Sequence, residues 1–168
     1  VPVVVVVLAC AALLLRGVSE SAWVNATMVI LKVAILVFFC IVAFASFDGT
    51  NLTPFLPLGV LGVTAAAGQV FFSFIGFDAA STAGEEAKNP RKDLPFAIIG
   101  SLILVNGLYV VVALAALGAQ SWETTAGQNA EATLSGIANV ATGGTWAGNI
   151  IALGAIISIF SVVLVVLY

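Results

Sequence analysis

Long apolar runs alternate with shorter polar segments along the whole chain. The apolar runs cover residues 1–15, 23–47, 58–84, 95–118 and 146–168. A helix that crosses the hydrocarbon core of a bilayer needs about 20 mostly apolar residues, and a helix satisfies its own backbone hydrogen bonds there. The pattern therefore predicts an all-α integral membrane protein, with the end of one spanning helix in 1–15 and one spanning helix in each later run.

Composition points to lipid as the solvent of this chain. Of its 168 residues, 62% are hydrophobic and 8% are charged, whereas a soluble domain carries about 25% charged residues. We expect a multi-pass protein of the cell membrane (plasma or inner membrane) with the lipid bilayer as a partner and no nucleic-acid partner. Both ends of the chain lie inside apolar runs, which predicts a fragment of a larger membrane protein.

The residue types present argue against an enzyme. The chain has no histidine, and its membrane runs contain no clustered carboxylates that would form a nucleophile–base pair or a set of metal ligands. We therefore expect no catalytic residues, no metal site and no cofactor.

The positions of the basic residues predict a topology. Those outside the apolar runs are Arg16 and the group Lys88, Arg91 and Lys92. Cytoplasmic loops are enriched in Lys and Arg, so the loop 85–94 is predicted to be cytoplasmic, and the loops 48–57 and 119–145 extracellular. We expect Pro95 in the first turn of the helix that follows, and a short amphipathic helix at the membrane interface over 129–140.

Lys32 is the one basic residue within a predicted span. It lies about nine residues into the run 23–47, roughly 14 Å along a helix from the cytoplasmic start. One interpretation is structural, with the amine bound to a carbonyl or carboxylate of a neighbouring helix. In the other, burial disfavours the charged form of the amine. The group then gains and loses a proton during a conformational cycle, or its positive charge replaces a bound sodium ion.

The run 58–84 is interrupted by residues that weaken a helix. Gly76 destabilises the helical backbone and Ser73 offers competing local hydrogen bonds. If the helix unwinds over 72–76, the carbonyls of Phe72 and Ile75 become free to bind an ammonium group at mid-membrane. A continuous helix whose small residues allow close packing is the alternative.

Asp78 is a second intramembrane charge, and it has two open interpretations. Its carboxylate suits the N-terminus of a helix that restarts after the interruption. A proton-linked role in gating is compatible with the same position.

The run FFSFIGFDAASTAGEEAKNPRKDLPFAI, beginning at residue 71, resembles the sixth transmembrane helix and following loop of amino acid permeases. These proteins belong to the amino acid–polyamine–organocation superfamily. The likeness looks closest to the cationic amino acid transporter branch, and GVSESAWVN with Lys32 downstream is similar to that branch's fifth helix. The resemblance implies a partial five-plus-five inverted-repeat (LeuT-like) fold with a discontinuous helix six, running here from the end of helix four to helix eight.

The resemblance also implies a substrate site. In the family, helix-six carbonyls bind the substrate ammonium, which corresponds here to Phe72 and Ile75 within a binding stretch that includes Ser73 and Gly76. The aromatic ring at Phe72 acts as a gate. The facing wall of the site comes from helices of the same full-length protein that lie outside this chain.

Further implied residues concern coupling. The lysine of helix five in proton-coupled members takes the place of a sodium ion and corresponds to Lys32. The acid at the position of Asp78 is linked to gating or proton coupling, and a helix-eight hydroxyl near the lysine corresponds to Ser158 or Ser161. We expect a secondary active amino acid transporter coupled to protons. The alternatives are a sodium-coupled or exchange-type amino acid or polyamine transporter, and a transporter-like amino acid sensor.

Overall fold

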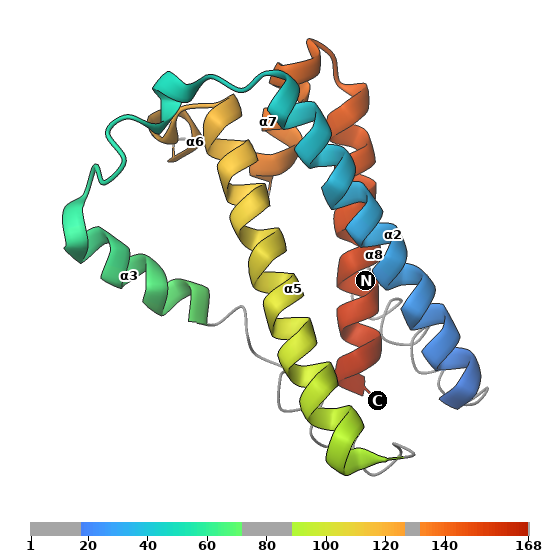
Figure 1. The fold of residues 1–168 in the computed structure, drawn as a ribbon. Coiled ribbons are helices and arrows are strands. Elements are labelled where there is room, and N and C mark those ends of the chain that lie inside the picture. Colours follow the sequence, from blue (N-terminus) through green and yellow to red (C-terminus); the bar gives the residue numbers. More distant parts are fainter. Residues whose placement is uncertain (1–17, 72–88, 127–131, 168) are drawn as a thin grey trace.

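All regular elements in the described residues are helices. The computed structural model describes residues 18–71, 89–126 and 132–167 (Figure 1). The helices are α2 (Val18–Ala45), η1 (Gly49–Leu52), α3 (Gly59–Phe71), α5 (Pro90–Ala119), α6 (Trp122–Ala126), α7 (Thr133–Thr142) and α8 (Trp146–Leu167). The prediction of an all-α chain is confirmed over these residues.

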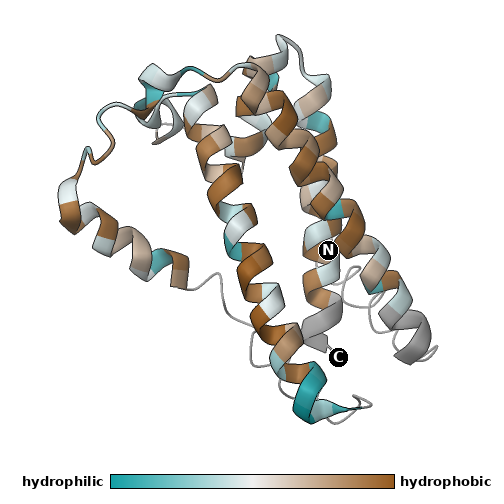
Figure 2. Cartoon of the chain, viewed as in Figure 1, coloured by the Kyte–Doolittle hydropathy of each residue, from teal (hydrophilic) through white to brown (hydrophobic). Residues whose placement is uncertain are grey.

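Three helices in the described part of the chain are long and apolar enough to cross a membrane. The candidate spans are Trp23–Ala45 in α2, Pro90–Ala119 in α5 and Trp146–Val163 in α8. Apolar residues cover most sides of these helices, and the hydrophilic colour at the lower end of α5 marks its start (Figure 2). A helix that is apolar all round is suited to contact with lipid or with other membrane helices.

The helices pack around α2. It contacts α8, α5 and α7, and α7 also packs on α8. The buried core lies where the second half of α2, the end of α5, α7 and the start of α8 meet; its members are Phe39, Cys40, Ala43, Ala115, Ile137, Ala138, Ala147 and Ile151. By contrast α3 has no buried residue and stands on the other side of α5 from α2 and α8 (Figure 1).

The segment after α2 is tied to the end of α5. The backbone N–H of Asp48 and the side-chain Nδ2 of Asn51 both donate to the carbonyl of Gly118, each at 2.9 Å. Gly118 lies directly under the ring of Phe47, so that any Cβ atom at this position would collide with the ring. This glycine therefore allows the close approach that the two hydrogen bonds require.

The short helix predicted over 129–140 corresponds to α7, whose described residues begin at Thr133. Its Ile137 and Ala138 are buried against the neighbouring helices. These two residues meet α2, α5 and α8, and the location of α7 at the membrane interface stays a prediction. Gly143 ends the helix in the left-handed conformation (φ 64°), which glycine adopts without strain.

The predicted start of the helix after the basic loop is also corrected. The helix α5 begins at Pro90, with Asn89 as N-cap residue, and Pro95 lies inside it. Pro90 already supplies the first-turn proline that the sequence analysis assigned to Pro95. Asp93 in the first turn accepts a hydrogen bond from the Asn89 backbone N–H at 3.2 Å. Residues 90–94 of the predicted loop therefore belong to the helix.

Candidate functional site at the α2–α8 interface

A short chain of hydrogen bonds joins α2 to α8. The Nζ atom of Lys32 donates to the hydroxyl of Ser161 at 3.2 Å. The Ser161 hydroxyl in turn donates to Oδ1 of Asn25 at 2.8 Å. Ser161 is buried, with 1% of its surface exposed, and Lys32 and Asn25 are half-buried. An ionisable amine in a spanning helix is thus bound to one buried hydroxyl, which is itself bound to the amide of Asn25.

One face of α8, which is rich in small residues, packs along α2. Ala147, Ile151, Gly154 and Ser161 are buried, and Ser158 between the last two is half-buried. The spacing of these positions alternates between four and three residues, which is the repeat of a helix face that packs along a second helix. The hydroxyl of Ser161 therefore lies on the same face as the glycine that permits close packing.

The register of the two helices follows from three contacts. Phe38 lies against Trp146, with ring centroids 5.9 Å apart. Ile35 lies against Gly154, and Lys32 reaches Ser161. Residue numbers decrease along α2 from one contact to the next while they increase along α8. The two helices are therefore antiparallel, as their ribbons show (Figure 1). This register brings the end of α8 beside the first half of α2.

Asn25 and Lys32 reach the same hydroxyl from two turns of one helix. They are seven positions apart in α2, a spacing that places both on one face. Long side chains on a helix point back towards its N-terminus. The lysine side chain therefore extends towards the level of Asn25, where one hydroxyl of α8 serves both residues.

The described partner of the Lys32 amine is polar and uncharged. The helix α8 contains no Asp, Glu, Lys or Arg, so it offers the amine a hydroxyl dipole and no opposite charge. Among the described residues no group of three or more His, Cys, Asp and Glu could hold a metal ion. An amine in such a setting is able to hydrogen-bond in both its neutral and its protonated form.

The structure brings together some of the residues singled out from the sequence. Of the two candidate hydroxyls on α8, Ser161 receives the hydrogen bond from Lys32, and Ser158 lies three residues earlier on the same helix. The remaining candidates lie outside the described residues: Phe72, Ser73, Ile75, Gly76 and Asp78. Helix α3 ends at Phe71, directly before them.

Asn25 is a member of the site that the sequence analysis did not assign. The signal for it is an amide side chain within an apolar run, seven positions before the intramembrane lysine. Two polar residues on one face of a spanning helix indicate a shared polar partner on a neighbouring helix.

A cavity of about 470 Å³ lies between the end of α3, the second half of α5 and the start of α7. Its lining is mostly apolar and consists of Gln69, Val70, Tyr109, Val112, Ala113, Ala116 and Leu134. Val70 lies two positions before the predicted binding stretch. This cavity is therefore a neighbour of that stretch along the chain.

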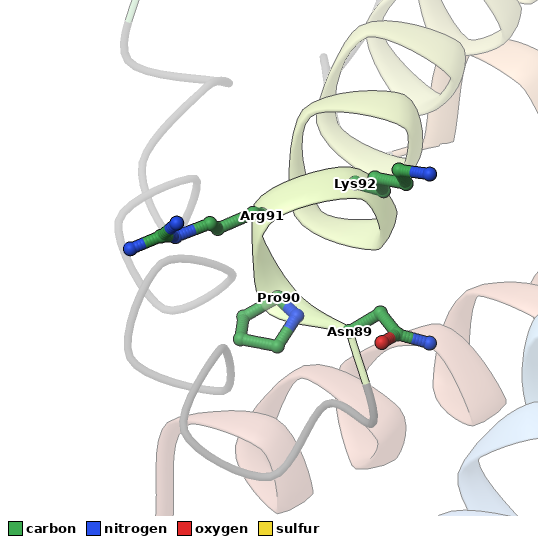
Figure 3. A pocket seen from close by; sticks show the side chains of 4 residues that line it. All are labelled: Asn89, Pro90, Arg91 and Lys92. Carbon is green, nitrogen blue, oxygen red and sulfur yellow. The ribbon is translucent and has the colours of Figure 1, made fainter.

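A second cavity, of about 400 Å³, lies at the start of α5 and is lined by Asn89, Pro90, Arg91 and Lys92. The side chains of Arg91 and Lys92 extend to opposite sides of the helix (Figure 3). They do not converge on one ligand, and their exposed charges suit a solvated helix end.

Comparison with known proteins identifies the family. The family model described as "Amino acid permease" matches residues 2–168. The branched-chain amino acid permease of Bacillus subtilis (strain 168) is 42% identical over 167 residues, covering 99% of this chain and 35% of the relative. The methylthioribose transporter of the same organism is 38% identical over 168 residues, which cover 99% of this chain and 35% of that relative.

Cationic amino acid transporters are also among the relatives, as the sequence resemblance predicted. Cationic amino acid transporter 5 of Arabidopsis thaliana is 36% identical over 98% of this chain and 28% of the relative. The chain therefore spans about a third of the length of the curated relatives that it matches. The chain belongs to the amino acid permease family of the amino acid–polyamine–organocation superfamily, whose members are multi-pass membrane transporters and not enzymes.

Proposed function

We propose that the complete protein is a secondary active transporter that carries amino acids across a membrane in symport with protons. Family membership and the names of the branched-chain and cationic relatives support an amino acid as substrate. The proposed fold is the five-plus-five inverted repeat with a discontinuous helix six. In that scheme α2 is helix five, α3 is the first half of helix six, α5 is helix seven and α8 is helix eight.

The single observation that carries the proposal of proton coupling is the Lys32–Ser161 hydrogen bond at the α2–α8 interface. A protonated amine at this position places a positive charge between the two helices and repels a sodium ion. Loss of the proton removes the charge and weakens the link between the helices. Proton binding is thereby connected to the relative stability of two helix arrangements, which is the requirement for coupling.

The substrate site in this proposal lies at the interruption of helix six. The carbonyls of Phe72 and Ile75 bind the substrate ammonium, and the Phe72 ring gates access. Ser73 and Gly76 allow the backbone to open, while Asp78 takes part in gating or proton transfer. The mostly apolar cavity lined by Val70 and Tyr109 would receive part of a substrate side chain.

The relatives define a panel of substrates to test. They include a branched-chain amino acid permease, a methylthioribose transporter and cationic amino acid transporters. We propose the cell membrane as the location, although relatives from Arabidopsis thaliana carry the descriptions chloroplastic and vacuolar.

The proposal is tested with the complete protein reconstituted in vesicles. Uptake of labelled leucine, arginine and methylthioribose is measured under an imposed proton gradient or an imposed sodium gradient. We expect a proton gradient to drive uptake of at least one of the two amino acids and a sodium gradient alone to drive none. Uptake driven by sodium alone would establish the sodium-coupled alternative, and uptake that requires internal amino acid would establish exchange. Binding without uptake would favour a sensor.

A further inference from the structure

The hydroxyl of Ser161 has one proton to donate, and the structure shows where that proton goes. It is directed at Oδ1 of Asn25, at an oxygen–oxygen distance of 2.8 Å. A serine hydroxyl has a single O–H donor and two acceptor lone pairs. With the donor used by Asn25, the lone pairs remain for the Lys32 amine, which approaches to 3.2 Å.

Without an acceptor at position 25, the hydroxyl has another partner within reach of its own helix. Serine in a helix commonly donates to the carbonyl of the residue four positions earlier, which for Ser161 is Ile157. Rotation towards that carbonyl turns the lone pairs away from their present direction. The amine then loses an oriented acceptor in a place where water is scarce.

We propose that Asn25 is a positioning residue, which orients the Ser161 hydroxyl as an acceptor for the Lys32 amine and thereby sets the pH range over which this amine holds its proton. A hydrogen bond to the charged form of a group favours that form. Ser161 is almost fully buried, so solvent cannot readily replace the orienting effect of the amide. A role of Asn25 in transport rests on the proposed proton coupling. Its effect on the proton affinity of the Lys32 amine does not depend on that proposal.

The helices packed against α2 carry few other titratable groups in the described part of the chain. Helices α7 and α8 contain no charged residue. Helix α5 has Arg91, Lys92 and Asp93 in its exposed first turn and Tyr109 further along. On α2 itself, Glu20 lies in the first turn and Cys40 lies eight positions beyond Lys32. The hydrogen bond from the Lys32 amine goes to Ser161.

The test measures protonation of Lys32 directly and requires no transport. The complete protein is treated with acetic anhydride over a range of pH, and acetylation of each lysine is measured by mass spectrometry. Only the neutral amine reacts, so the half-maximal pH reports proton affinity. The exposed Lys92 serves as an internal reference. The variants are Asn25→Leu, which keeps the approximate volume of the side chain, Ser161→Ala, and the two combined.

We expect Asn25→Leu to move the Lys32 half-maximal pH down by about one unit, a tenfold loss of proton affinity. Ser161→Ala should produce at least the same shift, and adding Asn25→Leu to it should change nothing further, because Asn25 acts through Ser161. Asn106→Leu is the matched control, since the Asn106 amide on α5 donates to the carbonyl of Leu102 in its own helix. This control should leave Lys32 unchanged.

An unchanged Lys32 profile in Asn25→Leu, or an equal further shift in the Ser161→Ala background, would overturn the proposal. Asn25→Ala is the second variant if Asn25→Leu does not fold. If neither Asn25 variant folds, Ser161→Ala still tests the proposal. An unchanged pH profile of Lys32 acetylation in Ser161→Ala would contradict the role of the hydroxyl and overturn the proposal. Uptake of labelled leucine and arginine by the same proteins separates the two proposals. An altered Lys32 profile without proton-driven uptake in the unmodified protein would count against the proposed function alone.

Discussion

Gly154 of α8 lies directly against the Ile35 side chain of α2. A Cβ atom on Gly154 would come within 2.8 Å of the Ile35 Cγ2 atom, closer than carbon atoms approach in proteins. The missing side chain lets the two helices approach, because small residues allow backbones of membrane helices to pack closely. Lys32 lies three positions before Ile35, and Ser161 lies seven positions after Gly154. This contact therefore fixes the helix spacing at which the lysine reaches the serine.

Gly154→Ala should destabilise the protein by about 1–3 kcal/mol, the usual cost of forcing an added methyl group into a packed interface. The measurement is the free energy of unfolding of the complete protein in detergent. Combining Gly154→Ala with Ile35→Ala should recover much of the loss, since the second change makes room for the methyl group. Gly107→Ala on α5 is the control, because a Cβ atom there meets nothing within 4 Å. Equal losses for Gly154→Ala and Gly107→Ala would contradict the packing argument.

Asn139→Ala should weaken the junction between α7 and α8. Oδ1 of Asn139 accepts a hydrogen bond of 2.9 Å from the backbone N–H of Gly148, in the first turn of α8. The first N–H groups of a helix have no partner within that helix. Losing a side-chain acceptor for such a group costs about 1 kcal/mol, and thermal unfolding measures this loss. Asn149→Ala changes an exposed amide in the same turn and should have little effect; a comparable loss there would argue against the role of Asn139.

Asp48 should make the segment after α2 sensitive to acid. The backbone N–H and then the hydroxyl of Thr50 donate to its carboxylate, and these bonds lower the pKa of Asp48. Because the pKa is lower in the folded state than in the unfolded state, the stabilisation is complete above the ordinary pKa. It is lost as pH falls through the lowered value. Hydrogen exchange should therefore show protection of the Thr50 amide at neutral pH that decreases below about pH 4.

Asp48→Ala should remove the protection of the Thr50 amide at neutral pH as well. Glu123→Ala, which changes another acidic residue in the predicted outer loop region, should leave it intact. Protection that stays constant across the acid range in the unmodified protein would show that the carboxylate does not hold this turn.

Three of the predicted runs coincide with helices long and apolar enough to span a membrane, because hydrophobicity over about 20 residues is a strong signal. Helix ends are harder to predict, as α5 shows. Pro90 and Pro95 both suit a first turn, and the earlier start is accompanied by the hydrogen bond from the Asn89 backbone N–H to the Asp93 carboxylate. The hydrophobic pattern of α7 also does not predict what its apolar side contacts, because an amphipathic helix buries that side equally well against lipid or against protein.

The site shows the same division between local and non-local information. Lys32 is evident from the sequence, since a charge within an apolar run is unfavourable unless it is used. Its partner on α8 is not, because Ser158 and Ser161 are separated by less than one turn and only the register of α2 against α8 distinguishes them. Asn25 is recognised as part of the site once Ser161 is known to bind both residues.

We propose above all that the Lys32 amine, bound to Ser161, is the group through which protons drive uptake. The direct test is uptake of labelled leucine and arginine by the complete protein in vesicles, with and without a proton gradient, for the unmodified protein, Lys32→Ala and Lys92→Ala. Lys92 is an exposed lysine in the first turn of α5 and serves as the control. We predict that uptake by Lys32→Ala no longer responds to the gradient, while Lys92→Ala keeps the response. A response of Lys32→Ala equal to that of the unmodified protein would contradict the claim.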